Sequence, residues 1–184
     1  AAFNPETGKG LWEVSATTMA TSGTMVWHKD LVFASGGFPK AETICIKADG
    51  SGKVVWKNTQ KCYEQSMIVH GGYVYAMTDP GIVFCWRATD GKVMWRERLR
   101  GPISSSPVIA GGNIYMSNEL GTTFVFKASP TKYIELGRNS LGNEVFSTPS
   151  ICGGRVYARV AHLSAGQRRE MLYCIGDKTT ASRR

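Results

Sequence analysis

Short apolar runs alternate with glycine-rich turns along the chain, and the pattern repeats at nearly constant spacing. A strand, a Gly-Gly turn and a second strand can be traced at residues 69–75, 109–115 and 151–157, with a degenerate copy at 27–33. Gly-Gly suits a tight hairpin whose turn needs positive φ. The aligned turn positions lie 42, 40 and 42 residues apart: Asp30, Gly72, Gly112 and Gly154. This regularity predicts a repeat protein built from β-hairpins.

Two further motifs complete each repeat. Gly-Lys-x-x-Trp recurs with tryptophans 44 and 39 residues apart, at residues 8–12, 52–56 and 91–95. An apolar strand of one recurring pattern is found at residues 44–48, 84–88, 124–128 and 173–176. Each period therefore holds four short strands, which is typical of a propeller blade. Only the insertion at residues 162–169 leaves room for a helix.

The predicted fold is an all-β propeller of about four blades, each a four-stranded antiparallel sheet. We expect propeller repeats over residues 1–176, with an outer strand at 7–14, blades at about 20–58, 62–98, 101–138 and 143–176, and a tail at 177–184. The last unit lacks its own outer strand, which the opening strand could supply.

Three arrangements stay open: a closed four-blade ring, two half-rings paired into a larger ring, or a piece of a longer polypeptide. The chain opens with Ala1 rather than methionine, and we favour a fragment.

The repeated tryptophans and cysteines have a structural interpretation. Trp12, Trp56 and Trp95 fall on the outermost strand of each unit, where an indole can pack against the next blade. A ligand-stacking role is the weaker alternative. Cys45, Cys85 and Cys174 share one repeat position, which Val125 fills in the third copy. A small apolar residue suits such a position, and without a Cys-x-x-Cys motif the five cysteines do not indicate a zinc or redox site.

Composition narrows the choice of partners. The chain has 184 residues, 42% of them hydrophobic and 20% charged, which is typical of a globular domain. A net charge of +8 favours acidic partners. The basic residues are scattered, however, and we expect a solvated surface rather than nucleic-acid binding. No apolar stretch approaches the roughly 20 residues that cross a membrane, and no signal peptide is visible.

The Gly-Lys-x-x-Trp motif and the Ala-x-Asp-like turn before it resemble the PQQ-like, or BamB-like, propeller repeat over nearly the whole chain. The latter half is more similar still to the carboxyl-terminal half of secreted PQQ-binding-like repeat proteins common in planctomycetes and related bacteria. That resemblance is carried by residues 103–108, 115–123, 126–128, 139–149 and 172–176. Such proteins have roughly seven or eight blades, so the resemblance implies half of a larger ring.

Propellers recognise partners through the loops around their central channel. On that face we place a mixed set of candidate ligand- or partner-binding residues: Glu64, Asp79, Arg100, Asn118, Glu119, Glu144 and Arg159. They are carboxylates, amides and guanidiniums without a concentrated site. His28 and His70 share a repeat register and therefore belong to different blades, so a shared metal is not expected.

The resemblance and these loops favour a non-catalytic binding or scaffold module of the bacterial envelope, periplasmic or secreted. Its partner would be a protein or small molecule, and another half-propeller chain is an alternative. The competing hypothesis is part of a PQQ-dependent quinoprotein dehydrogenase, which would hold PQQ with Ca²⁺. The chain has no adjacent cysteine pair and no evident Ca²⁺ ligand pattern. We therefore predict no catalytic residue, no metal site and no cofactor.

Overall fold

The computed structural model describes residues 1–176, so the expected tail at 177–184 lies outside the described residues. All regular structure in this part is β-strand, as the repeats predict. A two-stranded sheet pairs β1 (Ala2–Phe3) with β2 (Gly10–Trp12). The first four-stranded sheet consists of β3 (Val26–His28), β4 (Leu31–Gly36), β5 (Glu42–Lys47) and β6 (Val54–Asn58).

The later sheets repeat this antiparallel plan. The second consists of β7 (Ile68–His70), β8 (Tyr73–Met77), β9 (Ile82–Arg87) and β10 (Val93–Arg98). The third consists of β11 (Val108–Ala110), β12 (Asn113–Ser117), β13 (Thr122–Lys127) and β14 (Glu135–Ser140). The fourth has three strands, β15 (Ser150–Cys152), β16 (Arg155–Ser164) and β17 (Gln167–Ile175).

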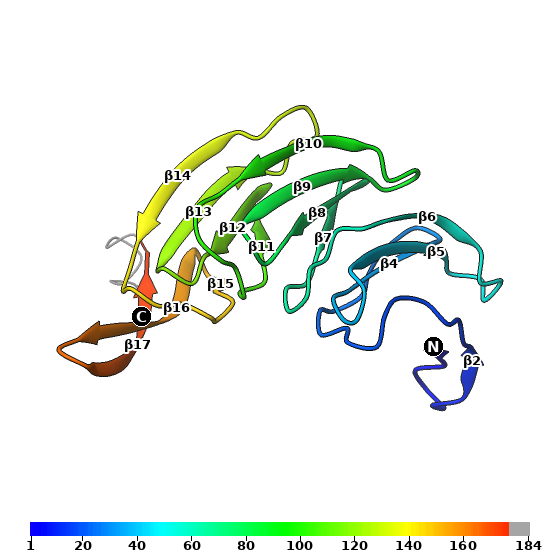
Figure 1. Cartoon of the computed structure of the whole chain (residues 1–184), viewed down its shortest axis with the longest axis horizontal. Helices are drawn as coiled ribbons and strands as arrows, with labels where there is room; N and C mark the ends of the chain where they lie inside the picture. Colours follow the sequence, from blue (N-terminus) through cyan, green and yellow to red (C-terminus); the bar gives the residue numbers. More distant parts are fainter. Residues whose placement is uncertain (177–184) are drawn as a thin grey trace.

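The sheets follow one another around an open arc, with the two ends of the chain far apart (Figure 1). β2 pairs with β1, by the register Ala2 to Trp12, and lies at the opposite end of the arc from β17. The chain therefore does not adopt the closed four-blade ring, in which the opening strand would complete the fourth sheet. The described residues form a half-ring of blade-like sheets.

The turns that join the strands explain the Gly-Gly motif. Gly71 and Gly72 have φ of 58° and 83°, and the equivalent glycines of the next two hairpins are also left-handed. In the degenerate first copy Lys29 adopts this conformation, with φ 55°, at a site that favours glycine. The first copy thus keeps the left-handed conformation at Lys29 but not at Asp30, which takes the place of Gly72.

Apolar side chains fill the first two interfaces between neighbouring sheets. Between the first and second sheets a buried cluster includes Phe33, Trp56 and Trp86. Between the second and third, a cluster includes Tyr75 and Phe126. Because the second sheet packs on both faces, its central strands β8 and β9 are nearly continuous in apolar residues. That pattern is what distinguishes a stacked blade from a sheet with one wet face.

One position on the outer strand recurs in strict register, opposite the shared cysteine position. Trp56 pairs with Cys45 and Trp95 with Cys85, each beside an irregularity in the ladder. In the third sheet, the corresponding residue opposite Val125 is Gly137. The third sheet therefore has no side chain at the place where the first two carry an indole.

The insertion at 162–169 is a β-hairpin, and the helix left open by the sequence does not form. β16 and β17 stay paired from Val156–Ile175 out to Ser164–Gln167. Ala165 and Gly166 form the turn, with φ of 50° and 76°. These two positive φ values are those of the two-residue turn that follows the natural twist of a hairpin. His162 accordingly lies on β16, not in a loop.

Candidate functional site

Three of the candidate residues line one shallow pocket at the ends of the strands. Glu64, Asp79 and Glu119 border a cavity of about 180 Å³ together with Ser104. Glu64 precedes β7, Asp79 lies in the β8–β9 turn and Glu119 in the β12–β13 turn. The fold therefore brings carboxylates from two neighbouring sheets to one place.

Backbone hydrogen bonds between successive sheets fix this pocket. Ile103 N donates to Asp79 O at 2.9 Å, and Glu119 N donates to Pro102 O at 2.9 Å. Ser104 Oγ donates to Glu119 Oε1 at 2.6 Å. The segment that connects β10 to β11 is thus held by both turns, and the Glu119 carboxylate is oriented rather than free.

Asp79 is engaged in a similar way. Its Oδ1 accepts a hydrogen bond from Tyr63 N at 3.3 Å, and Lys61 Nζ lies 3.0 Å from its Oδ2. Glu64, in contrast, is exposed. Of the three carboxylates, Glu64 has the greatest exposure for contact with a partner.

Asn118 stabilises the β12–β13 turn and contacts the backbone of Arg100. Asn118 is 2% exposed, and its Nδ2 donates to Arg100 O at 2.6 Å. Its Oδ1 accepts from Thr122 N at 2.8 Å. Arg100 contributes its backbone carbonyl to this contact, and the residue is exposed. The amide of Asn118 therefore shapes the loop that carries Glu119 and is itself out of reach of a ligand.

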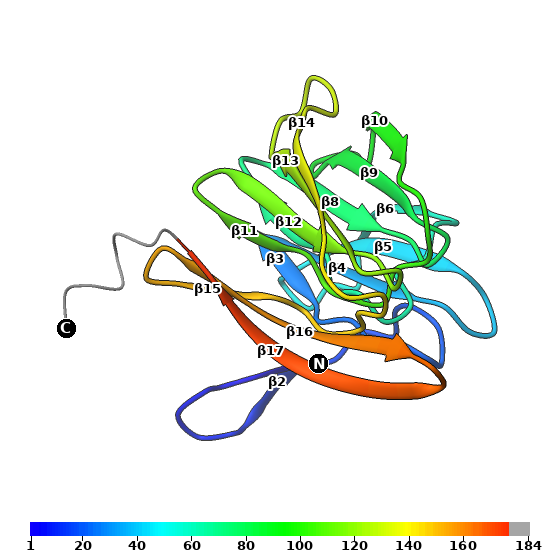
Figure 2. The same cartoon turned by 90° about the vertical axis from the view of Figure 1, so that its left-hand side faces the viewer.

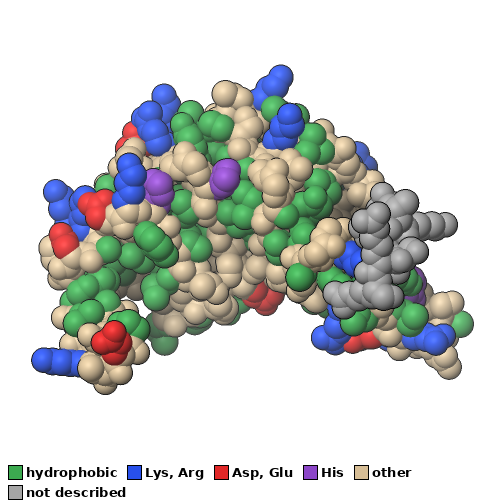
Figure 3. Space-filling view, turned by 180° about the vertical axis from the view of Figure 1, so that it is seen from behind, with side chains coloured by type: hydrophobic (Ala, Val, Ile, Leu, Met, Phe, Trp, Pro, Cys, Tyr) green, Lys and Arg blue, Asp and Glu red, His purple; other side chains and the backbone are tan. Residues whose placement is uncertain are grey.

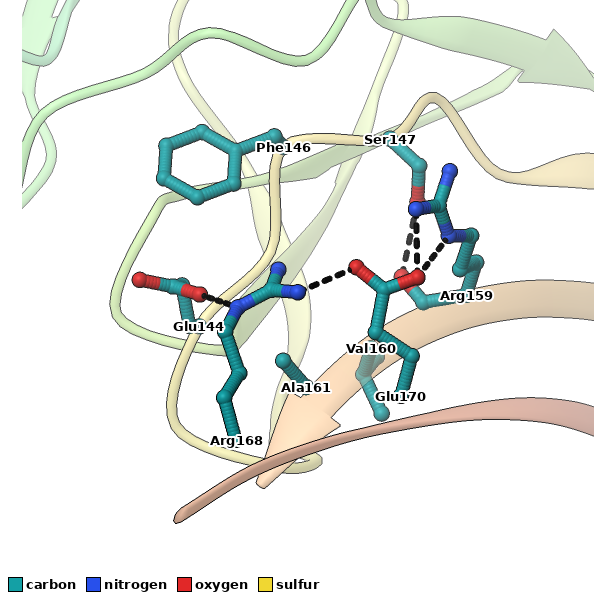
Figure 4. Close-up of a pocket in the computed structure, with 8 residues that line it drawn as sticks. All are labelled: Glu144, Phe146, Ser147, Arg159, Val160, Ala161, Arg168 and Glu170. Carbon is teal, nitrogen blue, oxygen red and sulfur yellow. Dashed lines mark hydrogen bonds and ion pairs between the residues drawn. The ribbon is translucent and has the colours of Figure 1, made fainter. Parts of the chain in front are cut away.

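The remaining candidates, Glu144 and Arg159, line a second pocket of about 200 Å³ (Figure 4). Arg168 lies between two carboxylates: its Nε donates to Glu144 Oε2 at 2.5 Å and its Nη1 to Glu170 Oε1 at 2.5 Å. Arg159 Nε donates to the other oxygen of Glu170 at 2.6 Å. Two guanidiniums and two carboxylates alternate along the turn-proximal half of the long hairpin, and Phe146 lies beside them.

These contacts change the proton affinity of the pocket. Hydrogen bonds from Arg168 and Arg159 hold the pKa of Glu170 below its usual range. Hydrogen bonds to Glu144 and Glu170 raise the pKa of Arg168. Glu170 and Arg168 are thus ionised near neutral pH. Paired charges of this kind suit recognition of polar groups.

Sequence reasoning missed Arg168 and Glu170 as members of this pocket. Their signal was present, because alternating charged residues on a paired strand project together on one face. The possible helix at 162–169 obscured it. It also missed Gln65, which is buried at 1% exposure and donates from Nε2 to Ile103 O.

The described residues contain no cluster of metal ligands, and three of their cysteines are buried. No group of three or more His, Cys, Asp or Glu side chains that could hold a metal ion occurs within residues 1–176. Burial raises the pKa of the Cys45, Cys62 and Cys85 thiols to about 12, so these thiols stay protonated and unreactive near neutral pH.

Comparison with known proteins identifies the repeats. Residues 40–129 match the family model described as outer membrane protein assembly factor BamB. Over these residues the chain is similar to the BamB propeller repeat. A curated BamB from Legionella pneumophila (strain Paris) is 18% identical over 159 residues, covering 74% of this chain and 41% of that protein.

Solved structures place the BamB-like arc among propellers. BamB from Moraxella catarrhalis superposes with a TM-score of 0.63 at 14% identity, covering 84% of this chain and 49% of that chain. The computationally designed Ika8 protein gives 0.68 at 14% identity over 93% of this chain and 51% of that one. The designed Ika4 protein gives 0.69 at 14% identity, covering 92% of this chain and 99% of Ika4. The chain thus spans about half the length of the BamB structure and less than half of the curated BamB.

The described part of the chain contains no helix of the length and hydropathy that a membrane crossing needs.

Proposed function

We propose that this chain is a non-catalytic, protein-binding scaffold of the bacterial envelope, acting in the periplasm or outside the cell. The observation that carries the proposal is the match of residues 40–129 to the outer membrane assembly factor BamB. The four-sheet arc supports it, because strand-end loops of a propeller are its usual recognition surface. The quinoprotein alternative lacks a comparable set of residues.

The binding surface we propose is the loop face defined by Glu64, Asp79, Glu119, Glu144 and Arg159. It combines an exposed carboxylate at Glu64 with the ion-paired pocket along the β16–β17 hairpin. Exposed charges of both signs contribute mostly to specificity and to the rate of encounter. We therefore expect a protein partner with a polar, charge-complementary surface.

Nucleic acid is a less suitable partner despite the net charge of +8. In the space-filling view of the far face, Lys and Arg side chains are scattered along the rim and at both ends, with hydrophobic side chains between them (Figure 3). A single-strand binding groove would gather basic residues along one track with stacking aromatics. The aromatic clusters here are instead buried between sheets.

We further propose that a second half-ring completes the propeller. The outer edge of β17 is open (Figure 2), and the β1–β2 pair is open at the opposite end of the arc (Figure 1). Exposed apolar side chains occur at both: Leu11 is 60% exposed and Leu172 is 74% exposed. Because β2 carries the same Gly-Lys-x-x-Trp motif as the outer strands β6 and β10, it suits the missing place beside the β17 of another half-ring.

Site-specific photo-crosslinking tests the proposed function. A photoreactive amino acid at Glu64 or Arg159 should crosslink to an envelope protein in intact cells, and mass spectrometry would identify it. Since Val93 begins the outer strand β10, at the end opposite the β8–β9 turn that carries Asp79, and is 51% exposed, the same probe at Val93 is the matched control. Crosslinks from Glu64 and Arg159 to no envelope protein, or equal crosslinking from Val93, would count against a scaffold role for the loop face.

A further inference from the structure

The third interface between sheets is built differently from the first two. Trp56 Nε1 donates to Ala88 O in the second sheet at 2.8 Å, and Trp95 Nε1 donates to Ser129 O beyond the third sheet's β13 at 2.8 Å. Gly137 occupies the same register on β14. A Cβ built on Gly137 would meet only Asn139 Nδ2, at 3.9 Å, so the space an indole would enter is open.

In the first two interfaces, aromatic side chains of both sheets pack around the indole. The ring of Trp56 lies 5.7 Å from Phe33 and 6.1 Å from Trp86, and the ring of Trp95 lies 6.1 Å from Tyr75 and 6.4 Å from Phe126.

In the repeat register, Tyr115 stands for Phe33 and Tyr75, because each pairs with the first residue of its inner strand. Ile175 stands for Trp86 and Phe126, because each pairs with the second residue of the neighbouring strand. Both Tyr115 and Ile175 line a single cavity between the third and fourth sheets.

The cavity has a volume of about 280 Å³. Its apolar walls come from both sheets, including Val125 on β13 with Val156 and Ala158 on β16. The lost packing shows in the exposure of the walls: Ile175 is 49% exposed, whereas its counterparts Trp86 and Phe126 are 1% and 0% exposed.

The polar side chains that line the cavity are all uncharged: Tyr115, Ser117, Thr123, Asn139, Ser140 and Ser147. Ser117 Oγ and Thr123 Oγ1 lie 2.8 Å apart and hydrogen-bond to each other. No charged side chain lines the cavity among the described residues. An ion would therefore lose its hydration without gaining a partner, and the site selects a neutral ligand.

We propose that this cavity is a binding site for a neutral, planar aromatic ring of about the size of indole. The chain itself supplies the precedent, since it places an indole between equivalent walls in the two preceding interfaces. Apolar cavities of about 150 Å³ already bind benzene, so the volume is sufficient. None of the proposed loop-face residues lines this cavity. A test of ring binding is therefore independent of the proposed scaffold role.

Binding of free indole to the 184-residue chain tests the proposal. Saturation-transfer NMR should show indole bound, and calorimetric unfolding should show a higher Tm with indole than without it. N-acetyltryptophanamide in a parallel experiment distinguishes the two sources of the ring. Binding of indole alone identifies a free aromatic compound, and binding of both extends the site to a tryptophan residue of a polypeptide. If neither indole nor N-acetyltryptophanamide binds, the proposal is overturned.

The variant Gly137→Trp should restore the repeat and fill the cavity. Gly137 is not left-handed, so a side chain is tolerated there. We expect the indole signal to be lost and the Tm of the free protein to rise by about 2–4 °C or more. The matched control is Leu136→Trp, which adds the same ring at an adjacent residue that is 47% exposed. It should leave indole binding unchanged.

A second variant covers the case in which Gly137→Trp does not fold. Ala158→Phe fills the same cavity from β16, and it should also abolish the indole signal. Retention of full indole binding by a folded Gly137→Trp or Ala158→Phe variant would contradict the proposed location of the site.

Discussion

Trp56 joins two sheets through a single side chain. It lies on the outer strand of the first sheet, is 8% exposed, and packs against Phe33 of its own sheet and Trp86 of the next. Its Nε1 donates to the backbone of Ala88. Trp95 has the same register but is only half-buried. The contribution of the tryptophan to stability should therefore differ between blades in proportion to its burial.

Trp56→Ala should lower the free energy of unfolding by about 3–5 kcal/mol, because it removes a buried ring and leaves a cavity between sheets. Trp56→Phe keeps much of the packing and should cost less, with about 1–3 kcal/mol from the unpaired Ala88 carbonyl. Urea denaturation measures both. Trp95→Ala is the comparison and should cost less than Trp56→Ala. Equal losses at the two positions would contradict the role of burial.

Burial also divides the five cysteines. Cys45, Cys62 and Cys85 are buried, whereas Cys152 and Cys174 are exposed. Cys174 was expected to share the buried position of Cys45 and Cys85. It is exposed because β17 is the edge strand of the fourth sheet.

An aromatic disulfide reagent at pH 8 should therefore modify two thiols rapidly in the native protein and all five in denaturant. Burial raises the pKa of each of the three buried thiols from 9.0 to about 12. The folded state then holds more protons than the unfolded state between these values, and stability should fall as pH rises above 9. Rapid modification of a third thiol at pH 8 would show that an interface between sheets opens.

At the scale of the element, the turn between the last two strands of a sheet packs against the tryptophan of the preceding sheet. Gly91 has φ +69°, and a Cβ there would lie 2.7 Å from Trp56 Cδ2. Gly50 repeats this contact with Trp12, whose Cβ would be 2.7 Å away. Gly91 is the glycine of its own Gly-Lys-x-x-Trp motif, whereas Gly50 precedes the motif glycine Gly52. In both turns a left-handed glycine contacts the tryptophan of the preceding motif.

Gly91→Ala should destabilise the protein by about 2–4 kcal/mol, from left-handed strain together with crowding of the indole. The control is Gly111→Ala, which has φ +56° with nothing within 4 Å of the added carbon. It should cost only the backbone strain, about 1–2 kcal/mol. Thermal unfolding of the two variants gives the comparison. A loss of stability in Gly111→Ala as large as that in Gly91→Ala would contradict the proposed contact between Gly91 and Trp56.

At the scale of the whole molecule, the sequence predicts the sheets better than the way they are joined. The period of the Gly-Gly turns and of Trp12, Trp56 and Trp95 places every blade, since local turn chemistry and alternation dictate strands directly. The pairing of β2 and the open arc depend on contacts between distant segments, which no local pattern specifies. The pairing of Glu144 with Arg168 could not be predicted, because Arg168 comes from an extended hairpin whose period is ambiguous in the sequence.

The native mass of the 20.1 kDa chain in solution, measured by light scattering or native mass spectrometry, tests the central claim most directly. A half-ring with open ends at β2 and β17 predicts a defined species of twice the chain mass, in which two arcs close one propeller. A monodisperse monomer across micromolar concentrations would contradict completion of the ring by a second copy.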